Sequence, residues 1–354
     1  MCIVLLTTGH PSYALIVLDN RDEFVRRPTS RPHWWTLNNH EILSSRDLQR
    51  EERGTWLGIT KTGSFAVLTN YRETNTADAD HPVQGTHSRG GMVTAWLANR
   101  EKETTQDFVR RLLEGGSVKA VGGFSLVCGK LRKRSDLAAG LEPLAIVSNR
   151  SGSPDDVPWL LEERGVVYGL SNTSYDDPVT WPKVKLGKEK LSQIIEEATQ
   201  TGLGEKEMVE KFYALLDTDT LPQQNGQEFE DYIYQLRKSI FIPPIGQETS
   251  CQNTPKNDQT DTVSKPAVQV PAGKRGSSDS ELRDEERPDA VTNDCMSGIY
   301  GTQRQTILLV DWNGRATFFE RSLWDERGIP IERGNGDMKF EFQIEGWDEE
   351  KGGN

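Results

Sequence analysis

The N-terminal stretch MCIVLLTTGHPSYALIVLDNRDE, residues 1–23, is the part of the sequence that decides the predicted fold class. Residues 2–8 and 13–18 form two short, largely apolar runs, and the turn-forming residues 9–12 join them. Two such runs joined by a turn predict a β-hairpin, and apolar side chains on both faces predict strands that are covered on both sides. The hairpin places the end of the second strand close to the beginning of the first.

Further strand and helix candidates follow along the chain. Apolar or β-branched runs predict strands at residues 55–60, 64–70, 124–128, 145–148, 166–170, 306–310 and 316–319. Helical periodicity predicts amphipathic helices at residues 92–98, 105–113, 191–198, 208–216 and 229–236. Because the hairpins and the groups of helices do not alternate regularly, we expect a layered α+β fold rather than a regular βαβ fold.

The composition divides the chain into a core and a polar insertion. The 354 residues are enough to bury a large core, although only 34% of them are hydrophobic. Residues 247–290 are rich in Ser, Thr, Gln, Asn, Asp, Lys and Pro, so they cannot bury enough apolar surface to offset the entropy of ordering. We therefore expect a disordered insertion at 247–290 within a single discontinuous domain that spans residues 1–354.

Net charge and hydropathy argue against several classes of function. The net charge of −12 repels phosphate backbones, which argues against nucleic acid as a partner. No apolar run reaches the roughly 18 residues that a membrane-spanning helix needs. No basic region precedes the first apolar residues either, so neither a transmembrane segment nor a secretory signal is expected. A soluble intracellular protein is the resulting expectation, and these features do not choose its compartment.

The cysteines and histidines predict neither a disulfide framework nor a metal site. The four cysteines are scattered without a C-x-x-C pair, and the five histidines show no H-E-x-x-H spacing. The sequence also lacks a glycine-rich phosphate loop after a strand. No metal and no cofactor are therefore expected.

Cys2 is the candidate nucleophile. Removal of an initiator methionine before a small residue would make Cys2 the N-terminal residue, with a thiol and an α-amine on the same residue. An α-amine has a pKa of about 7.7–8.0, so part of it is neutral near neutral pH and can accept the thiol proton. The alternative is that a small second residue has no catalytic meaning.

The charged motif Asn20-Arg21-Asp22-Glu23 follows the second apolar run, and the hairpin brings it near Cys2. Its charges either pair with one another locally, or Arg21 and Asp22 project into the site. In the second case an Arg–Asp pair would hold the thiol and the amine in register, because the guanidinium group offers a fixed planar fork of donors.

Asparagines also occur at strand ends. Asn70, Asn149 and Asn172 each follow a short apolar run. Asparagine is a common turn residue at such places. Its amide group can also donate a hydrogen bond to a developing oxyanion without a change of charge. Both interpretations of the three asparagines stay open from the residues alone.

The order of these motifs resembles that of a known family. After Met1-Cys2-Ile3 and residues 20–23 come Thr55-Trp56-Leu57-Gly58-Ile59, Thr69-Asn70-Tyr71-Arg72, Ser88-Arg89-Gly90, Ser148-Asn149-Arg150, Gly169-Leu170-Ser171-Asn172-Thr173, Trp181-Pro182-Lys183-Val184 and Tyr300-Gly301-Thr302. The set resembles the NRDE family, which is the transport and Golgi organisation protein 2 family, over nearly the whole chain except the polar insertion. The family usually has Arg directly after Gly-Thr, whereas here Gln303 stands in that place and Arg304 follows.

The resemblance implies a fold and a set of roles. The family looks related to the N-terminal-nucleophile hydrolases, such as choloylglycine hydrolases and penicillin V acylases, so it implies a four-layer αββα sandwich. By that similarity Cys2 would attack an amide, and Arg21 and Asp22 would position it. Asn70 would donate to the oxyanion, and Asn172 would hold the α-amine.

The resemblance also implies two kinds of function. The family name implies a part in protein secretion and Golgi organisation, and members have been linked to haem trafficking, lipid and acyl-CoA balance, and mitochondria. A protein of this kind would bind haem or an acyl thioester and would be cytoplasmic, with an association with the Golgi apparatus or mitochondria. The alternative is a Cys-dependent amidohydrolase that cleaves a linear C–N bond in a small-molecule amide.

Overall fold

The computed structural model describes residues 2–72, 85–100, 102–116, 118, 121–134, 140–222, 233–246 and 298–348. Its strands are β1 (Ile3–Thr7), β2 (Tyr13–Phe24), β3 (His33–Leu37), β4 (His40–Ser44), β5 (Leu57–Thr60), β6 (Ser64–Asn70), β7 (Phe124–Lys130), β8 (Leu144–Ser148), β9 (Trp159–Leu160), β10 (Val167–Leu170), β11 (Tyr300–Asp311), β12 (Arg315–Ser322) and β13 (Asp337–Gln343). Its helices are α1 (Gly90–Leu97), α2 (Thr105–Glu114), α3 (Pro182–Thr201), α4 (Glu205–Leu216) and the short 3-10 helices η2 (Pro154–Asp156) and η3 (Gln235–Arg237). The predicted disordered insertion at residues 247–290 lies outside the described residues.

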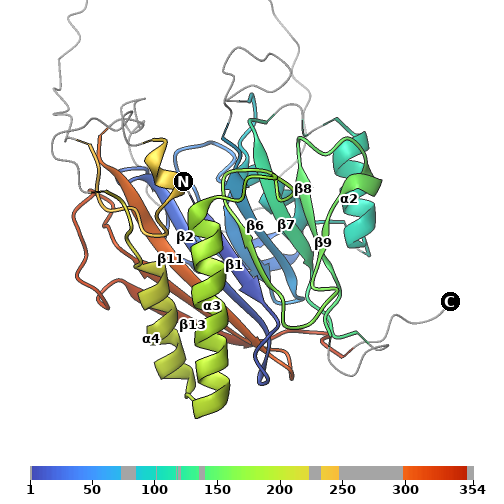
Figure 1. Cartoon of the computed structure of the whole chain (residues 1–354). Coiled ribbons are helices and arrows are strands. Elements are labelled where there is room, and N and C mark those ends of the chain that lie inside the picture. Colours follow the sequence, from blue (N-terminus) through green and yellow to red (C-terminus); the bar gives the residue numbers. More distant parts are fainter. Residues whose placement is uncertain are drawn as a thin grey trace, which may run out of the picture.

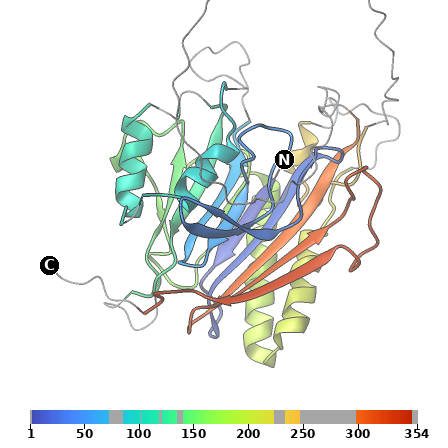
Figure 2. The same cartoon turned by 180° about the vertical axis from the view of Figure 1, so that it is seen from behind.

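Two antiparallel sheets form the centre of the molecule, as Figures 1 and 2 show from opposite sides. The first sheet has the strand order β10-β1-β2-β11-β12-β13, and the second has the order β3-β4-β5-β6-β7-β8-β9. β2 pairs with β11, so strands from the two ends of the chain lie side by side in the first sheet. This pairing joins the residues near Cys2 to residues that follow the polar segment.

Three apolar cores separate four layers. Side chains of both sheets, among them Val17 and Phe65, form the core between the sheets. A second core lies between the first sheet and the helices α3 and α4, and it includes Ile16 and Phe212. A third core, around Trp96, lies between the second sheet and the helices α1 and α2. The layer order is therefore helix, sheet, sheet, helix, which confirms the predicted four-layer αββα sandwich.

Side-chain alternation along β2 explains how one strand serves two cores. Leu15 and Val17 belong to the core between the sheets, whereas Ile16 and Leu18 belong to the core under α3 and α4. Successive side chains of a strand point to opposite faces, so a strand covered on both sides needs apolar residues at every position. The predicted hairpin with two covered faces is confirmed.

The second strand extends beyond the predicted run at 13–18. It continues through the charged motif and ends at Phe24. The pairing with β11 supplies the reason, because Tyr300 lies opposite Phe24 and Thr302 lies opposite Asp22. The register shifts between Thr302 and Arg304, so Gln303 is the extra residue of a β-bulge.

Other differences concern elements that the sequence prediction missed or began at another residue. β3, β4, β9 and β13 are missing from the sequence prediction, and α3 begins at Pro182 rather than at residue 191. The helix predicted at 229–236 is wrong for its described part, where Gln235–Arg237 form a short 3-10 helix. The predicted strand pair around residues 61–63 is confirmed, and Gly63 takes the positive φ of 79° that this turn requires.

Candidate active site

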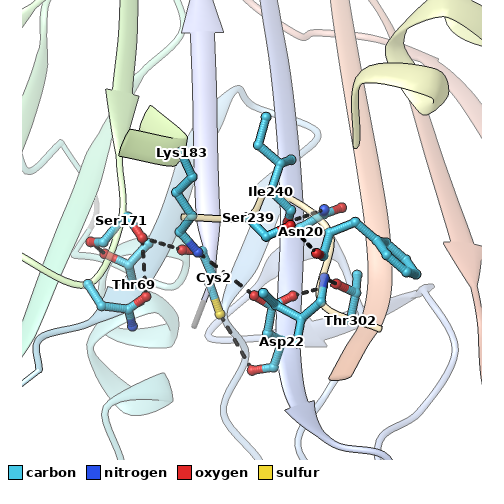
Figure 3. Close-up of polar contacts among 12 residues, drawn as sticks. Cys2, Asn20, Asp22, Thr69, Ser171, Lys183, Ser239, Ile240 and Thr302 are labelled. Carbon is cyan, nitrogen blue, oxygen red and sulfur yellow. Dashed lines mark hydrogen bonds and ion pairs between the residues drawn. The ribbon is translucent and has the colours of Figure 1, made fainter. Parts of the chain in front are cut away.

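Cys2 lies directly before β1 and is half-buried. Its Sγ atom lies 3.8 Å from the backbone carbonyl oxygen of Asp22, toward which the thiol points. The Ser171 hydroxyl donates a hydrogen bond of 2.7 Å to the Cys2 carbonyl oxygen, and the Thr69 hydroxyl donates one of 2.7 Å to the Ser171 carbonyl oxygen (Figure 3). These bonds fix the backbone of Cys2 between the two sheets.

A cavity of about 240 Å³ opens beside Cys2. Residues of both sheets and of the segment before α1 form its wall. The described residues that line it are Cys2, Arg21, Asp22, Glu23, Arg27, Asp47, Arg50, Thr55, Trp56, Leu68, Asn70, Gly85, His87, Ser88, Arg89, Gly90, Gly122 and Tyr300. The wall is mostly polar, so the cavity suits a ligand that carries polar or charged groups.

Asp22 connects three elements next to the thiol. Its Oδ1 atom accepts a hydrogen bond of 2.7 Å from the Thr302 hydroxyl on β11, and its backbone carbonyl oxygen accepts one of 3.1 Å from Tyr300. Its Oδ2 atom lies 4.0 Å from Nζ of Lys183 on α3, and both of these side chains are 0% exposed (Figure 3). A hydrogen-bonded and charge-paired carboxylate in this position can hold neighbouring groups in a fixed orientation.

Arg21 has a different set of partners. Its guanidinium group lies 4.2 Å above the ring of Trp56, donates a hydrogen bond to the side-chain oxygen of Gln303, and lies 3.8 Å from a carboxylate oxygen of Glu23. Arg21 and Asp22 are neighbours on one strand, so their side chains leave it on opposite faces. Both residues nevertheless line the cavity. Arg21 therefore pairs locally with Glu23 and also lies in the wall of the site.

The three strand-end asparagines take different positions. Asn70 is the exposed last residue of β6 and lines the cavity. Asn172 is 4% exposed, and its side-chain amide lies 3.3 Å from the hydroxyl oxygen of Ser171, which donates its proton to the Cys2 carbonyl oxygen. Asn149 accepts a hydrogen bond of 3.4 Å from the backbone N–H of Phe124, as a turn residue does.

Burial and charge set the protonation of this cluster. Burial raises the pKa of the Cys2 thiol to about 11, and the carboxylates of Asp22 and Asp19 act in the same direction. Burial also raises the pKa of Tyr300 well above its usual value. Burial lowers the pKa of Lys183, and the charges of Asp22 and Cys2 oppose that change. The thiolate of Cys2 therefore needs help from neighbouring groups in order to form.

The sequence prediction did not assign three neighbours of Cys2 and Asp22 to the site, namely Lys183, Thr302 and Ser171. The sequence carried one signal for Lys183. It precedes Val184 and lies on the same helical stripe as Gly187 and Leu191, so it falls on the buried face of α3. Because the predicted helix began at residue 191, this stripe did not extend back to the lysine.

Other kinds of site find little support in the part of the chain that the structure describes. No group of three or more His, Cys, Asp or Glu side chains could hold a metal ion among the described residues. In the same residues, none of the helices combines the length and the apolar character that crossing a bilayer requires.

The layers and the site together define a class. A cysteine at the start of the first strand faces a cavity between two antiparallel sheets, and helices cover both outer faces. This is a four-layer αββα protein with a cysteine-lined cavity. The family model described as Transport and Golgi organisation 2 matches residues 1–325, so the chain belongs to the Transport and Golgi organisation 2 family.

Known proteins similar to this chain include members of that family and hydrolases. The transport and Golgi organization protein 2 homolog of Homo sapiens is 27% identical over 92% of this chain and 94% of the relative. An uncharacterized protein of Saccharomyces cerevisiae is 25% identical over 97% of this chain and 100% of the relative. The solved structure of a mutant conjugated bile acid hydrolase from Clostridium perfringens is 7% identical, with a TM-score of 0.38, and the match covers 97% of this chain and 98% of that chain.

Proposed function

We propose that this protein supports protein secretion and Golgi organisation, or the trafficking of haem or lipid, by holding a small molecule in the cavity beside Cys2. The cavity of about 240 Å³, lined by residues of both sheets, is the observation that carries the proposal. The name of the human relative supplies the connection to transport and the Golgi apparatus. In this proposal the protein works in the cytoplasm, in association with the Golgi apparatus or with mitochondria.

The chemistry of the wall favours a ligand with an anionic group. Arg21, Arg27, Arg50 and Arg89 are among the described wall residues. Guanidinium groups bind carboxylates and phosphates through paired hydrogen bonds. Haem carries carboxylates and an acyl thioester of coenzyme A carries phosphates, so both of these ligands fit that wall chemistry. Two of the acids in the wall, Glu23 and Asp47, lie 3.6 and 2.6 Å from Arg27 and partly neutralise it.

A pair of tryptophan variants tests the binding role. Ser88 lines the cavity, so Ser88→Trp should fill it without removing any group of the Cys2 cluster. Ser12 is exposed in the turn after β1, so Ser12→Trp is the matched control. We expect Ser12→Trp, but not Ser88→Trp, to restore secretion in a strain that lacks the protein. Full restoration by Ser88→Trp at normal protein levels would contradict the proposal.

Amide hydrolysis is the second candidate function, and the position of Cys2 and Asp22 in the cavity wall favours it. Once Met1 is removed, the α-amine of Cys2 would accept the thiol proton, and the thiolate would attack the amide carbonyl. The C–N bond would break as the amine leaves with that proton, and water would then hydrolyse the thioester.

The other predicted site residues take supporting roles in this second proposal. Asn70, exposed at the cavity wall, would donate to the oxyanion. Asn172 would hold the α-amine, because its neighbour Ser171 bonds to the Cys2 carbonyl oxygen. Arg21 and Asp22 would keep the thiol and the amine in register.

Two measurements test the hydrolase proposal. The mass of the N-terminal peptide from the native host should show a chain that begins at unmodified Cys2. Turnover of a linear amide should then fall by roughly 10⁴-fold or more in Cys2→Ser, as expected for the loss of a nucleophile. Retained Met1, or unchanged turnover in Cys2→Ser, would refute this mechanism. Complementation by Cys2→Ala at normal protein levels would favour the binding role.

A further inference from the structure

Lys183 is a buried charge to which the roles above assign no function. It is the second residue of α3, and its side chain is 0% exposed. Lysine is almost never fully buried unless it is paired, and its partner here is the equally buried carboxylate of Asp22 at 4.0 Å. Replacing a buried ion pair by apolar residues is often neutral or stabilising, so stability alone does not explain the pair.

The thiol of Cys2 shares this environment. Its Sγ atom lies 3.8 Å from the backbone carbonyl oxygen of Asp22, and the carboxylate of the same residue lies 4.0 Å from Nζ of Lys183. An ammonium group in this position favours the thiolate form of the cysteine, because an opposite charge nearby favours an ionised group. The other titratable groups around the thiol are Asp19 and Asp22 on β2, Tyr300 on β11 and the α-amine of the chain.

Two further charged groups of β2, Arg21 and Glu23, line the same cavity. They lie 3.8 Å from each other, so each partly neutralises the other. Lys183 is the cation that α3 contributes from the helix side of the first sheet.

We propose that Lys183 is a positioning residue that allows Cys2 to react as a thiolate, because its ammonium group pairs with Asp22 and offsets the repulsion between that carboxylate and the thiolate. The consequence for function rests on the proposed role of Cys2. A nearby like charge disfavours an ionised group and an opposite charge favours it. Without Lys183, two negative charges would face each other in a buried site, and the thiol would stay protonated.

Alkylation of Cys2 by iodoacetamide tests this without any substrate. The rate is measured at about pH 8 from the mass of the N-terminal peptide, because the thiolate is the species that reacts. In Lys183→Met the rate should fall by about tenfold or more, since an opposite charge at this range moves a pKa by at least about one unit. In Asp22→Asn the rate should rise, because the repelling carboxylate is gone.

Two controls separate charge from loosened packing. Val184→Ala removes apolar packing from the same turn of α3, and the Cys2 rate should stay at its wild-type value. Cys128 is a fully buried free cysteine, so its alkylation in the same samples reports unfolding. A Cys2 rate that is unchanged in Lys183→Met, while Cys128 stays protected, would overturn the proposal.

A second comparison applies if Lys183→Met unfolds. The double variant Asp22→Asn/Lys183→Met carries neither charge, and its Cys2 rate should lie below that of Asp22→Asn. Equal rates in these two variants would also overturn the proposal. If the wild-type protein hydrolyses no amide but these rates shift, the hydrolase proposal fails and the role of Lys183 stands. If turnover is retained in Lys183→Met and the rates do not shift, only the role of Lys183 fails.

Discussion

The two helix-covered faces of the sandwich have the same architecture but different chemistry at their cysteines. On the second sheet, α1 and α2 cover an apolar core that contains Cys128, and burial raises the pKa of that thiol far above its usual value. On the first sheet, α3 and α4 cover an apolar core that ends in a polar cluster beside Cys2. Burial acts on both thiols, and only Cys2 has charged neighbours and a cavity. The comparison shows that the two thiols differ in their charged neighbours and in access to a cavity rather than in burial.

The largest expected effect is the difference in reactivity between the two thiols. Cys2 should react with iodoacetamide at least ~10³ times faster than Cys128, because a thiol in the core reacts only when the core opens, and core opening costs several kcal/mol. Peptide-resolved mass spectrometry over time measures both rates in one sample. Similar rates would show that Cys2 is as inaccessible to the reagent as Cys128, which would contradict the comparison.

The next effect concerns the buried ion pair. Lys183→Met leaves the Asp22 carboxylate buried without this ammonium group, so the free energy of unfolding should fall by about 3–5 kcal/mol. The control is Lys339→Met, which removes a lysine that is 44% exposed and lies 3.1 Å from Glu205. An exposed pair contributes about 0–1 kcal/mol. Urea unfolding measures the free energy of unfolding of both variants. Equal losses in the two would contradict the larger contribution expected from the buried pair of Lys183.

A pH series sharpens the comparison further. The Cys2 pKa of about 11 lies above the neutral range, so the thiolate fraction is small at neutral pH and grows as the pH rises. The alkylation rate of Cys2 should therefore rise about tenfold for each pH unit below that value. A rate that levels off near pH 8 would mean that the neighbouring cations lower the thiol pKa more than the geometry implies.

The smallest effect tests the helix layer that lacks the polar cluster. The Thr104 hydroxyl accepts a hydrogen bond of 3.1 Å from the backbone N–H of Asp107 and caps α2. Thr104→Ala should lower the free energy of unfolding by about 1 kcal/mol. The alkylation rate of Cys2 should not change. A changed rate would show that the two helix layers are coupled, whereas the comparison treats them as independent.

Local sequence patterns predicted most of the strands and helices of the sandwich. The strands that the prediction missed have identifiable causes. Polar and apolar residues alternate strictly along β13, where Met338, Phe340 and Phe342 are partly buried between exposed polar residues, so this strand was an overlooked signal. β3 and β4 meet at Asn38 and Asn39, both at positive φ, and this Asn-Asn turn was an overlooked hairpin signal. β9 has two residues and becomes a strand only through its pairing with β8.

The candidate site also combines contacts that the sequence predicts with contacts that it does not predict. Cys2 and Asp22 are neighbours because a tight turn joins two paired strands, and a hairpin is a local consequence of the sequence. Thr302 reaches Asp22 across 280 positions of the chain, and no periodicity within a window relates such residues. Lys183 was visible as part of a motif, yet its partner could not be read from the helix that carries it.

The sequence by itself determined the elements whose side chains repeat every two or about 3.6 residues. The order of its motifs also identified the family. The tertiary structure alone decided the pairing of β2 with β11, the layer order and the meeting of Asp22 with Lys183. The physical reason is the separation along the chain over which each effect acts. Periodicity and turn chemistry act between residues that are close along the chain, whereas burial of a charge depends on which distant segments exclude water from it.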